Sequence, residues 1–371
     1  MLLLITAAFL LLYALLIFYY FYHWLHIKTY SSEGSNATFI SIIVAARNEE
    51  RHIERLLQSL EGQSYPKHLY EIIVVDDFST DRTKELAQNF SGSDIKIIQP
   101  GISAEKSSKK KAIEAGIQVA RGELIVITDA DCYLQRGWLQ TIGAYQHKTD
   151  AVFIAAPVKL RAGVSLVSVF QSLDFITLQG ITAASVQANF HSMCNGANLA
   201  YRRDAFFEAG GFAGIDKIAS GDDMLLMYKI WKKYPSKVFY LKSSEAIVET
   251  EPMATWKDFF SQRIRWSSKA TYYQDKRVML VLAFVYFFNC LFFVLLAAFC
   301  FDVFYGWVLL FYLVAKLFIE FPFVFSVARF YKEQKLMAYF PLLQPLHILY
   351  TVVIGLVSQF GKYEWKGRKT K

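Results

Sequence analysis

The chain is poor in cysteine and shows no internal repeat and no low-complexity linker. Its four cysteines (Cys132, Cys194, Cys290 and Cys300) stand at no spacing typical of a metal site. Two of them fall within a hydrophobic run, so a disulfide framework is not indicated and all four are expected to be reduced. A zinc site, a disulfide scaffold and a repeat architecture are therefore not predicted.

Charge is missing from the first part of the chain. Residues 1–25 contain no Lys, Arg, Asp or Glu, and a membrane-spanning helix needs about 20 apolar residues. A cleaved signal peptide would have a basic start and a small-residue cleavage site. Neither is evident here, so we predict a retained transmembrane anchor over residues 1–27.

Further hydrophobic runs lie toward the other end. Val278–Phe301 and Val303–Val327 are separated by one residue, which predicts a tight helical hairpin. Lys316 and Glu320 fall within the second run at i, i+4 spacing, where they can neutralise each other. Residues 337–360 form a weaker candidate because two prolines interrupt them.

Positive charge gathers beside these runs, and the formal net charge is +8. The flanking cations are Lys28, Lys269, Lys276, Arg277, Arg329, Lys332 and Lys335. Such an excess marks the cytoplasmic side and favours anionic lipid headgroups. We predict a cytoplasmic middle region, an outside amino terminus, an inside basic tail (361–371) and no nucleic-acid partner. Three spans after the middle region would place the tail outside, so residues 337–360 are expected to be interfacial or re-entrant.

The middle of the chain alternates between predicted strands and helices. Short apolar runs predict strands at 39–45, 71–75 and 123–128, and helical patterns occupy 50–60, 83–90 and 109–120. This alternation predicts an α/β fold, a mostly parallel sheet with helices on both faces. Ligands bind such sheets beyond the carboxyl ends of their strands.

Polar motifs follow all three predicted strands. They are AlaArgAsnGlu at 46–49, AspAspPheSerThrAsp at 76–81 and AspAlaAsp at 129–131. A loop followed by a helix amino terminus can hold a nucleotide, although the first motif could also be a surface turn. The second could equally cap a helix. Residues two apart in an extended chain face one side, so Asp129 and Asp131 converge as hard oxygen ligands for Mg²⁺ or Mn²⁺.

Four further segments are candidates for a site. SerSerLysLysLysAla (107–112) places cations at a helix amino terminus, against the helix dipole, which an anionic diphosphate would explain. Small residues in 194–203, followed by GlyGlyPhe (210–212), permit close approach of a sugar, although this segment could also be a plain structural loop. GlyAspAsp (221–223) offers a general base or only a helix cap. In GlnArgIleArgTrp (262–266), helical spacing puts Gln262, Arg265 and Trp266 on one arc beside an apolar arc expected in the membrane interface.

In this order and between hydrophobic spans, the motifs resemble a membrane-bound family 2 glycosyltransferase. The Gln-x-x-Arg-Trp motif resembles the branch of ceramide glucosyltransferases and cellulose synthases. The resemblance covers roughly residues 40–270 and implies a GT-A fold, a UDP-sugar donor, Mg²⁺ or Mn²⁺, and inversion. One departure is Asp222, where the family more often has Glu.

The resemblance also implies residue roles. Asp77 would contact the uracil, Lys109 or Lys110 a phosphate, Asp131 the metal and Asp129 the nucleotide-sugar. Asp223 would be the base, Arg265 would hold the leaving diphosphate and Trp266 would contact the acceptor. The full donor-binding set is Ala46, Arg47, Asn48, Glu49, Asp77, Lys109, Lys110, Asp129, Asp131, Asn195 and Gly196, with Asp129 and Asp131 on the metal. The catalytic set is Asp222, Asp223, Gln262, Arg265 and Trp266.

These inferences predict a domain order and a function. The order is an anchor (1–27), a GT-A domain (38–252), an interfacial helix (253–277), membrane helices (278–360) and the basic tail. A second element, Val164–Phe190, is expected beside the acceptor cleft. A lipid acceptor entering from the bilayer is favoured, because a polysaccharide synthase needs a larger channel, an oligomer or an accessory subunit. The remaining alternative is an inactive nucleotide-sugar-binding protein.

Overall fold

The computed structural model describes residues 1–32, 38–92, 94–103, 107–161, 163–190, 193–216, 218, 221–268, 272–273, 275–359, 363–365 and 368–370. The last two ranges are the strands β10 (Tyr363–Trp365) and β11 (Arg368–Thr370), described by their backbone alone. The side chains of the predicted basic tail, and Lys269, therefore lie outside the described residues.

The α/β region contains a seven-stranded sheet in the order β3-β2-β1-β4-β7-β5-β8. Its strands are β1 (Ile40–Ala46), β2 (Tyr70–Asp76), β3 (Ile95–Ile98), β4 (Leu124–Asp129), β5 (Phe153–Ala155), β7 (Leu199–Arg202) and β8 (Val238–Tyr240), and β6 (Val158–Leu160) pairs separately with β9 (Val248–Thr250). All sheet neighbours are parallel except those of β7, which runs antiparallel to β4 and β5. The predicted mostly parallel sheet is confirmed, with β7 as an addition.

Both faces of the sheet are covered because strand side chains alternate between them. On β1, Ile42 and Val44 join the core beneath α2 (Ile53–Glu61) and α5 (Trp138–Thr149), whereas Ile43 joins the core beneath α4 (Lys109–Val119). The remaining helices of this region are α3 (Thr83–Asn89), α7 (Arg203–Glu208) and α8 (Met224–Lys233).

A buried carboxylate ties three elements together near the amino-terminal end of the sheet. Glu71 is completely buried and accepts hydrogen bonds from Ser41 Oγ at 2.6 Å, Lys96 Nζ at 2.7 Å and the Arg121 N–H at 2.6 Å. Burial by itself would raise the pKa of Glu71, but the hydrogen bonds from Lys96, Ser41 and Arg121 outweigh it and lower the pKa.

A lowered folded-state pKa stabilises the fold above the unfolded pKa, and this contribution is lost as the pH falls through the folded value. We expect Glu71→Gln to lower the free energy of unfolding by about 1–3 kcal/mol at pH 7. The difference in stability between the wild type and Glu71→Gln should shrink when the pH falls below the ordinary pKa of glutamate. Thermal unfolding in detergent at pH 7 and at an acidic pH measures it. Glu85→Gln, on the surface of α3, is the control and should change little. An equal loss for Glu71→Gln at both pH values would contradict this linkage.

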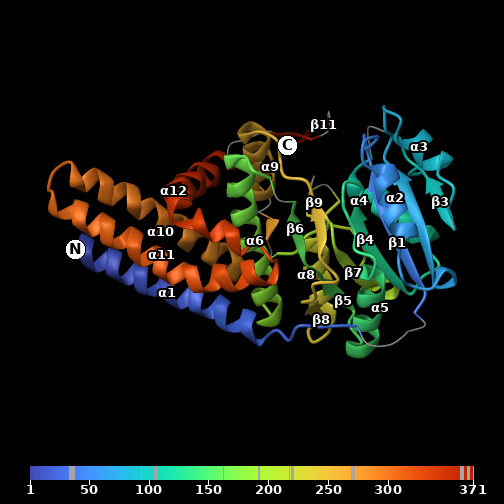
Figure 1. The fold of residues 1–371 in the computed structure, drawn as a ribbon, viewed down its shortest axis with the longest axis horizontal. Coiled ribbons are helices and arrows are strands. Elements are labelled where there is room, and N and C mark those ends of the chain that lie inside the picture. Colours follow the sequence, from blue (N-terminus) through green and yellow to red (C-terminus); the bar gives the residue numbers. More distant parts are fainter. Residues whose placement is uncertain are drawn as a thin grey trace.

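Apolar helices project from the α/β region (Figure 1). They are α1 (Leu2–His26), α10 (Lys276–Phe299), α11 (Phe304–Phe330) and α12 (Phe340–Val357), each long and apolar enough to cross a membrane. Figure 1 shows α1, α10 and α11 side by side, with their basic ends toward the sheet. The short 3₁₀ helix Gln334–Ala338 connects α11 to α12.

Helix α6 (Leu166–Gln187) also has the length and composition of a span but lies inside the protein. In its most apolar stretch 78% of the residues are buried, against 17–28% for α1, α10, α11 and α12. It packs between the α/β region and helices α1 and α11. The predicted element at 164–190 therefore joins the two parts of the molecule.

The predicted pair within α11 forms, with Lys316 Nζ 2.7 Å from Glu320 Oε1. Gln344 of α12 accepts from Lys316 at 2.6 Å and donates to Glu320 at 2.7 Å. Tyr13 of α1 donates to the same carboxylate. These contacts join three helices around a charge pair that is buried and hydrogen-bonded, which is the condition for tolerating such charges in an apolar setting.

Candidate active site

A continuous cavity of about 1080 Å³ connects the carboxyl ends of the parallel strands with the apolar helices. Its polar part is lined by Ala46, Arg47, Glu49, Asp77, Lys109, Asp129, Asp131, Asn195, Gly196, Asp222, Asp223, Thr250 and Glu251. Its apolar part is lined by Leu16, Ile17, Val281, Leu282, Val285, Phe323, Val324, Leu343 and Ile354. Arg265 also lines the polar part, and Gln262 and Trp266 line the same cavity. Of the predicted site residues, the lining lacks Asn48 and Lys110.

The loops after β1 and β2 are held against each other. Arg47 donates from Nη1 to the Asp77 carbonyl at 2.6 Å, and the Asp77 carboxylate accepts from Ser107 Oγ. Asn48 adopts a left-handed conformation with φ of 54°, and its Oδ1 accepts from the Thr80 N–H at 2.9 Å. This hydrogen bond ties the loop after β1 to the loop after β2. Asn48 therefore stabilises the edge of the cavity but does not line it.

The remaining residues of the first motif also lie at this edge. The Ala46 carbonyl accepts from the Asp77 N–H at 2.8 Å, which continues the pairing of β1 with β2. Glu49 has an oxygen 2.9 Å from His52 Nδ1, and its N–H donates to Thr83 Oγ1 at 2.7 Å. These contacts bring the helix that follows β1 close to the helix that follows β2.

The two candidate lysines have different environments. Lys109 lies 2.6 Å from Asp129 Oδ1 and 3.6 Å from Asp222 Oδ2. Burial opposes its charge, but these carboxylates prevail and raise the pKa of Lys109, so the side chain stays cationic. Lys110 is buried and donates to the Ile218 carbonyl. Lys109 is thus the lysine that reaches the cavity.

The polar part of the cavity is rich in carboxylates. Among the described lining residues it holds seven (Glu49, Asp77, Asp129, Asp131, Asp222, Asp223 and Glu251) against three cations (Arg47, Lys109 and Arg265). Asp131 Oδ2 accepts from Thr250 Oγ1 at 3.2 Å. No cluster of three or more His, Cys, Asp or Glu ligands occurs in the described chain. Two carboxylates still fit Mg²⁺ or Mn²⁺, because such ions take their other ligands from water and substrate phosphates.

Asp223 is positioned by backbone groups at the start of α8. Its Oδ1 accepts from the Met224 N–H at 2.7 Å, and Oδ2 accepts from the Gly196 N–H at 3.2 Å. A Cβ on Gly196 would lie 3.4 Å from both Asp222 Oδ2 and Lys109 Nζ. These are ordinary van der Waals distances, so the 194–196 segment passes close beside the acidic pair without a steric requirement for glycine. Asn195 turns this segment by accepting from the Ala197 N–H at 3.0 Å.

Helix α9 (Trp256–Ser267) carries the last motif. It begins at Thr255, whose Oγ1 accepts from the Asp258 N–H at 3.1 Å. Its apolar arc was expected in the membrane interface, but Phe259 is completely buried and packs on Phe170 and Tyr350. Protein therefore covers Phe259, while the motif side chains line the cavity.

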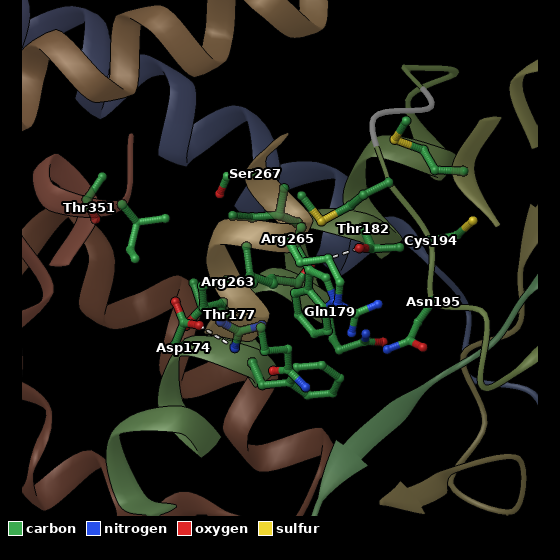
Figure 2. Close-up of a pocket in the computed structure, with 18 of the residues that line it drawn as sticks. Asp174, Thr177, Gln179, Thr182, Cys194, Asn195, Arg263, Arg265, Ser267 and Thr351 are labelled. Carbon is green, nitrogen blue, oxygen red and sulfur yellow. Dashed lines mark hydrogen bonds and ion pairs between the residues drawn. The ribbon is translucent and has the colours of Figure 1, made fainter. Parts of the chain in front are cut away.

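Sequence reasoning overlooked a second charged pair on the cavity wall. Arg263 of α9 and Asp174 of α6 form a buried ion pair with 2.6 Å between Nη2 and Oδ2. In Figure 2, Arg265 lies between this pair and Asn195. A signal was present, since Asp174 is the only charged residue of α6 and an isolated charge in an apolar helix requires a partner.

The comparisons with known proteins agree with this geometry. Residues 41–209 match the model of Glycosyl transferase family 2. This segment belongs to glycosyltransferase family 2. The match supports the family that the motifs resembled for residues 41–209 and leaves the ceramide glucosyltransferase and cellulose synthase branch as a prediction.

Similar curated proteins act on different acceptors. A poly(ribitol-phosphate) beta-N-acetylglucosaminyltransferase from Staphylococcus aureus is 31% identical over 117 residues, covering 31% of this chain and 20% of its own. A beta-monoglucosyldiacylglycerol synthase from Nostoc sp. is 36% identical over 97 residues, covering 25% of this chain and 20% of its own. The chain spans about three fifths of the length of the first curated relatives that it matches.

A solved structure shares the architecture of the whole chain. The mannosyltransferase PcManGT from Pyrobaculum calidifontis, in complex with GDP-Man and Mn²⁺, superposes with a TM-score of 0.62 and covers 96% of each chain. At 18% sequence identity this likeness shows the GT-A fold and carries no assignment of donor or acceptor.

Proposed function

We propose that this family 2 glycosyltransferase moves a sugar from a UDP-sugar to a lipid of the membrane in one inverting displacement. The observation that carries this proposal is the continuous cavity, with carboxylates at one part and apolar side chains of α1, α10 and α12 at the other. A nucleotide-sugar suits the polar part, and a lipid chain suits the apolar part.

The side chains at the junction divide the work of the displacement. Arg265 holds the diphosphate of the donor through its fixed, permanently charged donor fork and stabilises charge developing as the sugar bond breaks. Asp223 accepts the proton of the acceptor hydroxyl, which attacks the anomeric carbon from the face opposite the diphosphate. Trp266 contacts the acceptor.

The acidic lining requires positive charge before an anionic donor can bind. Asp129 and Asp131 would hold Mg²⁺ or Mn²⁺, which supplies charge neutralisation for the diphosphate. Lys109, already paired with Asp129, stays cationic beside this position.

The distribution of charge supports a cytoplasmic α/β region. The described flanking cations Lys28, Lys276, Arg277 and Arg329 lie at or next to the ends of α1, α10 and α11 that meet this region. Helix α12, which contacts α9 and α10, stays a candidate for an interfacial or re-entrant helix. This arrangement keeps the tail on the cytoplasmic side, with the donor available from the cytosol.

A lipid acceptor is favoured over a polymer because the cavity reaches into the apolar helices. One relative makes a glucosyldiacylglycerol and another modifies a polymer, so similarity alone leaves both acceptors open. A polysaccharide synthase of this chain would need further helices from an oligomer or an accessory subunit. An inactive binding protein is disfavoured because Asp131, Asp223 and Arg265 line one cavity.

The test is transfer of radiolabel from UDP-sugars, with Mg²⁺ or Mn²⁺, in membranes containing the chain. Label that partitions into organic solvent and depends on Asp223 would support a lipid glycosyltransferase and identify its sugar. Label found only in a water-soluble or insoluble polymer would replace the lipid acceptor with a growing glycan.

Filling the apolar part of the cavity should impair acceptor binding specifically. Overpacking costs about 1–3 kcal/mol, and a loss of about 1.4 kcal/mol in binding free energy lowers affinity tenfold. Val281→Trp should therefore reduce the amount of labelled lipid by about tenfold. UDP binding should remain. Leu280, the adjacent residue on α10, is 70% exposed and does not line the cavity. Leu280→Trp is therefore the matched control, and equal losses in both variants would argue against a lipid in this cavity.

A further inference from the structure

Three polar side chains from three helices meet on the cavity wall next to Trp266. Arg263 of α9 is paired with Asp174 of α6, and His347 of α12 places Nε2 3.8 Å from Asp174 Oδ1. The side chains of Arg263 and Asp174 are only 3% and 6% exposed, and all three residues line the cavity. We refer to Arg263, Asp174 and His347 as the Arg263 cluster, of which Figure 2 shows Arg263 and Asp174.

The cluster holds hydrogen-bonding groups that the described chain leaves unused. Arg263 Nε and Nη1, His347 Nδ1 and Asp174 Oδ2 are buried and have no hydrogen-bond partner among the described residues. The Tyr350 hydroxyl also interacts with the Arg263 guanidinium group. The guanidinium group lies 4.3 Å from the centre of the Trp266 ring. A buried donor without a partner costs about 1–3 kcal/mol. An oxygen of a molecule in the cavity would remove this cost.

Helix packing alone does not account for the ion pair. The three helices already pack through aromatic rings. The ring centre of Phe259 on α9 lies 5.7 Å from that of Phe170 on α6 and 5.4 Å from that of Tyr350 on α12. A buried ion pair adds little stability compared with apolar residues of similar size. The pair is better explained by what it presents to the cavity.

The charges near the cluster decide which chemistry it suits. Asp174 neutralises Arg263, and farther along the wall Glu320 neutralises Lys316, with Gln344 bonded to both. An anionic group would therefore gain little net attraction while losing its hydration. A neutral carbonyl oxygen loses much less hydration and would gain hydrogen bonds from Arg263.

We propose that the Arg263 cluster is a binding subsite for a neutral hydrogen-bond-accepting oxygen, such as an ester or amide carbonyl, in the acceptor lipid. This subsite rests on the proposed lipid acceptor and narrows it to lipids that carry such an oxygen near the reacting hydroxyl. The Trp266 ring, which lies against the Arg263 guanidinium group, borders the subsite. Asp174 pairs with Nη2 of the guanidinium group, which leaves the Nε and Nη1 N–H groups to donate to a ligand.

The test compares two lipids that differ in this oxygen. A fluorescent dioctanoylglycerol is bound to the detergent-solubilised full chain and displaced by unlabelled dioctanoylglycerol or by its dialkyl ether analogue, which lacks the carbonyls. One hydrogen bond of about 1.4 kcal/mol changes affinity about tenfold. The ester should therefore displace the probe at about one tenth of the concentration that the ether needs. In the double variant Arg263→Met with Asp174→Leu, which removes both charges and the N–H donors with apolar side chains of comparable size, the difference should vanish.

Controls separate the subsite from the fold and from the proposed function. UDP binding checks that the double variant folds, and Lys257→Gln, exposed on α9, should keep the ester preference. A preference that persists in the double variant, or stronger displacement by octyl phosphate, would overturn the subsite while leaving a lipid acceptor in place. Failure of all lipids to bind, with no label in organic solvent, would overturn the proposed function and the subsite with it.

Discussion

Replacing Asp223 with asparagine is expected to reduce sugar transfer by about 10²–10⁴-fold, the range contributed by a general base. The amide keeps the size of the side chain but cannot accept the acceptor proton. The carboxylate takes hydrogen bonds from the Gly196 and Met224 N–H groups, which hold it beside the predicted donor position. Initial rates with saturating UDP-sugar and lipid measure this loss, and UDP affinity measured by calorimetry should persist.

Asp222 provides the matched control for this variant. It is adjacent in sequence, lines the same cavity and lies 3.6 Å from Lys109. Asp222→Asn should reduce transfer less than Asp223→Asn, because it alters the charge around the donor and leaves the base in place. A larger loss for Asp222→Asn would exchange the two roles. Lost UDP binding in Asp223→Asn would assign Asp223 to the donor instead.

Removing divalent metal is expected to stop transfer, with activity restored by Mg²⁺ or Mn²⁺. The seven described carboxylates of the polar part outnumber its three cations, so an anionic diphosphate binds there only when charge is supplied. Asp131→Asn should lower the rate by about 10²–10³-fold, the usual cost of removing one electrostatic contact in catalysis. It should also raise the metal concentration required for half-maximal rate.

Thr250→Val tests whether this effect belongs to the carboxylate itself. Thr250 donates to Asp131 at 3.2 Å, so its loss should shift the metal requirement only modestly, by no more than about tenfold for one hydrogen bond. Full transfer in the presence of excess chelator would exclude a metal-dependent reaction. Unchanged metal dependence in Asp131→Asn would place the metal ligand elsewhere.

Local pattern was sufficient for the main strands of the sheet. The strands predicted at 39–45, 71–75 and 123–128 are β1, β2 and β4, since each is a mainly apolar run buried on both faces. Strands β5, β6, β8 and β9 have three residues each, too few for a periodic signal. The sequence also did not predict that β7 inserts between β4 and β5 in the antiparallel direction, because strand direction depends on the neighbouring strands.

The candidate site divides in the same way. The residues at strand ends were found because the carboxyl ends of parallel strands meet at one edge of a sheet. Lys109 and Lys110 could not be separated by sequence, since both open the same helix. The structure brings Lys109 to Asp129 and directs Lys110 to the Ile218 carbonyl.

The amino-acid sequence by itself determined the parallel α/β region, the apolar helices before and after it in the chain, and the polar motifs at strand ends. These are properties of short segments, set by periodicity and by the length of apolar runs. Only the tertiary structure decided that α6 is an internal helix and that Asp174, Arg263 and His347 share one cavity wall. Those residues come from three helices far apart in the chain, and packing of the helices brings them together.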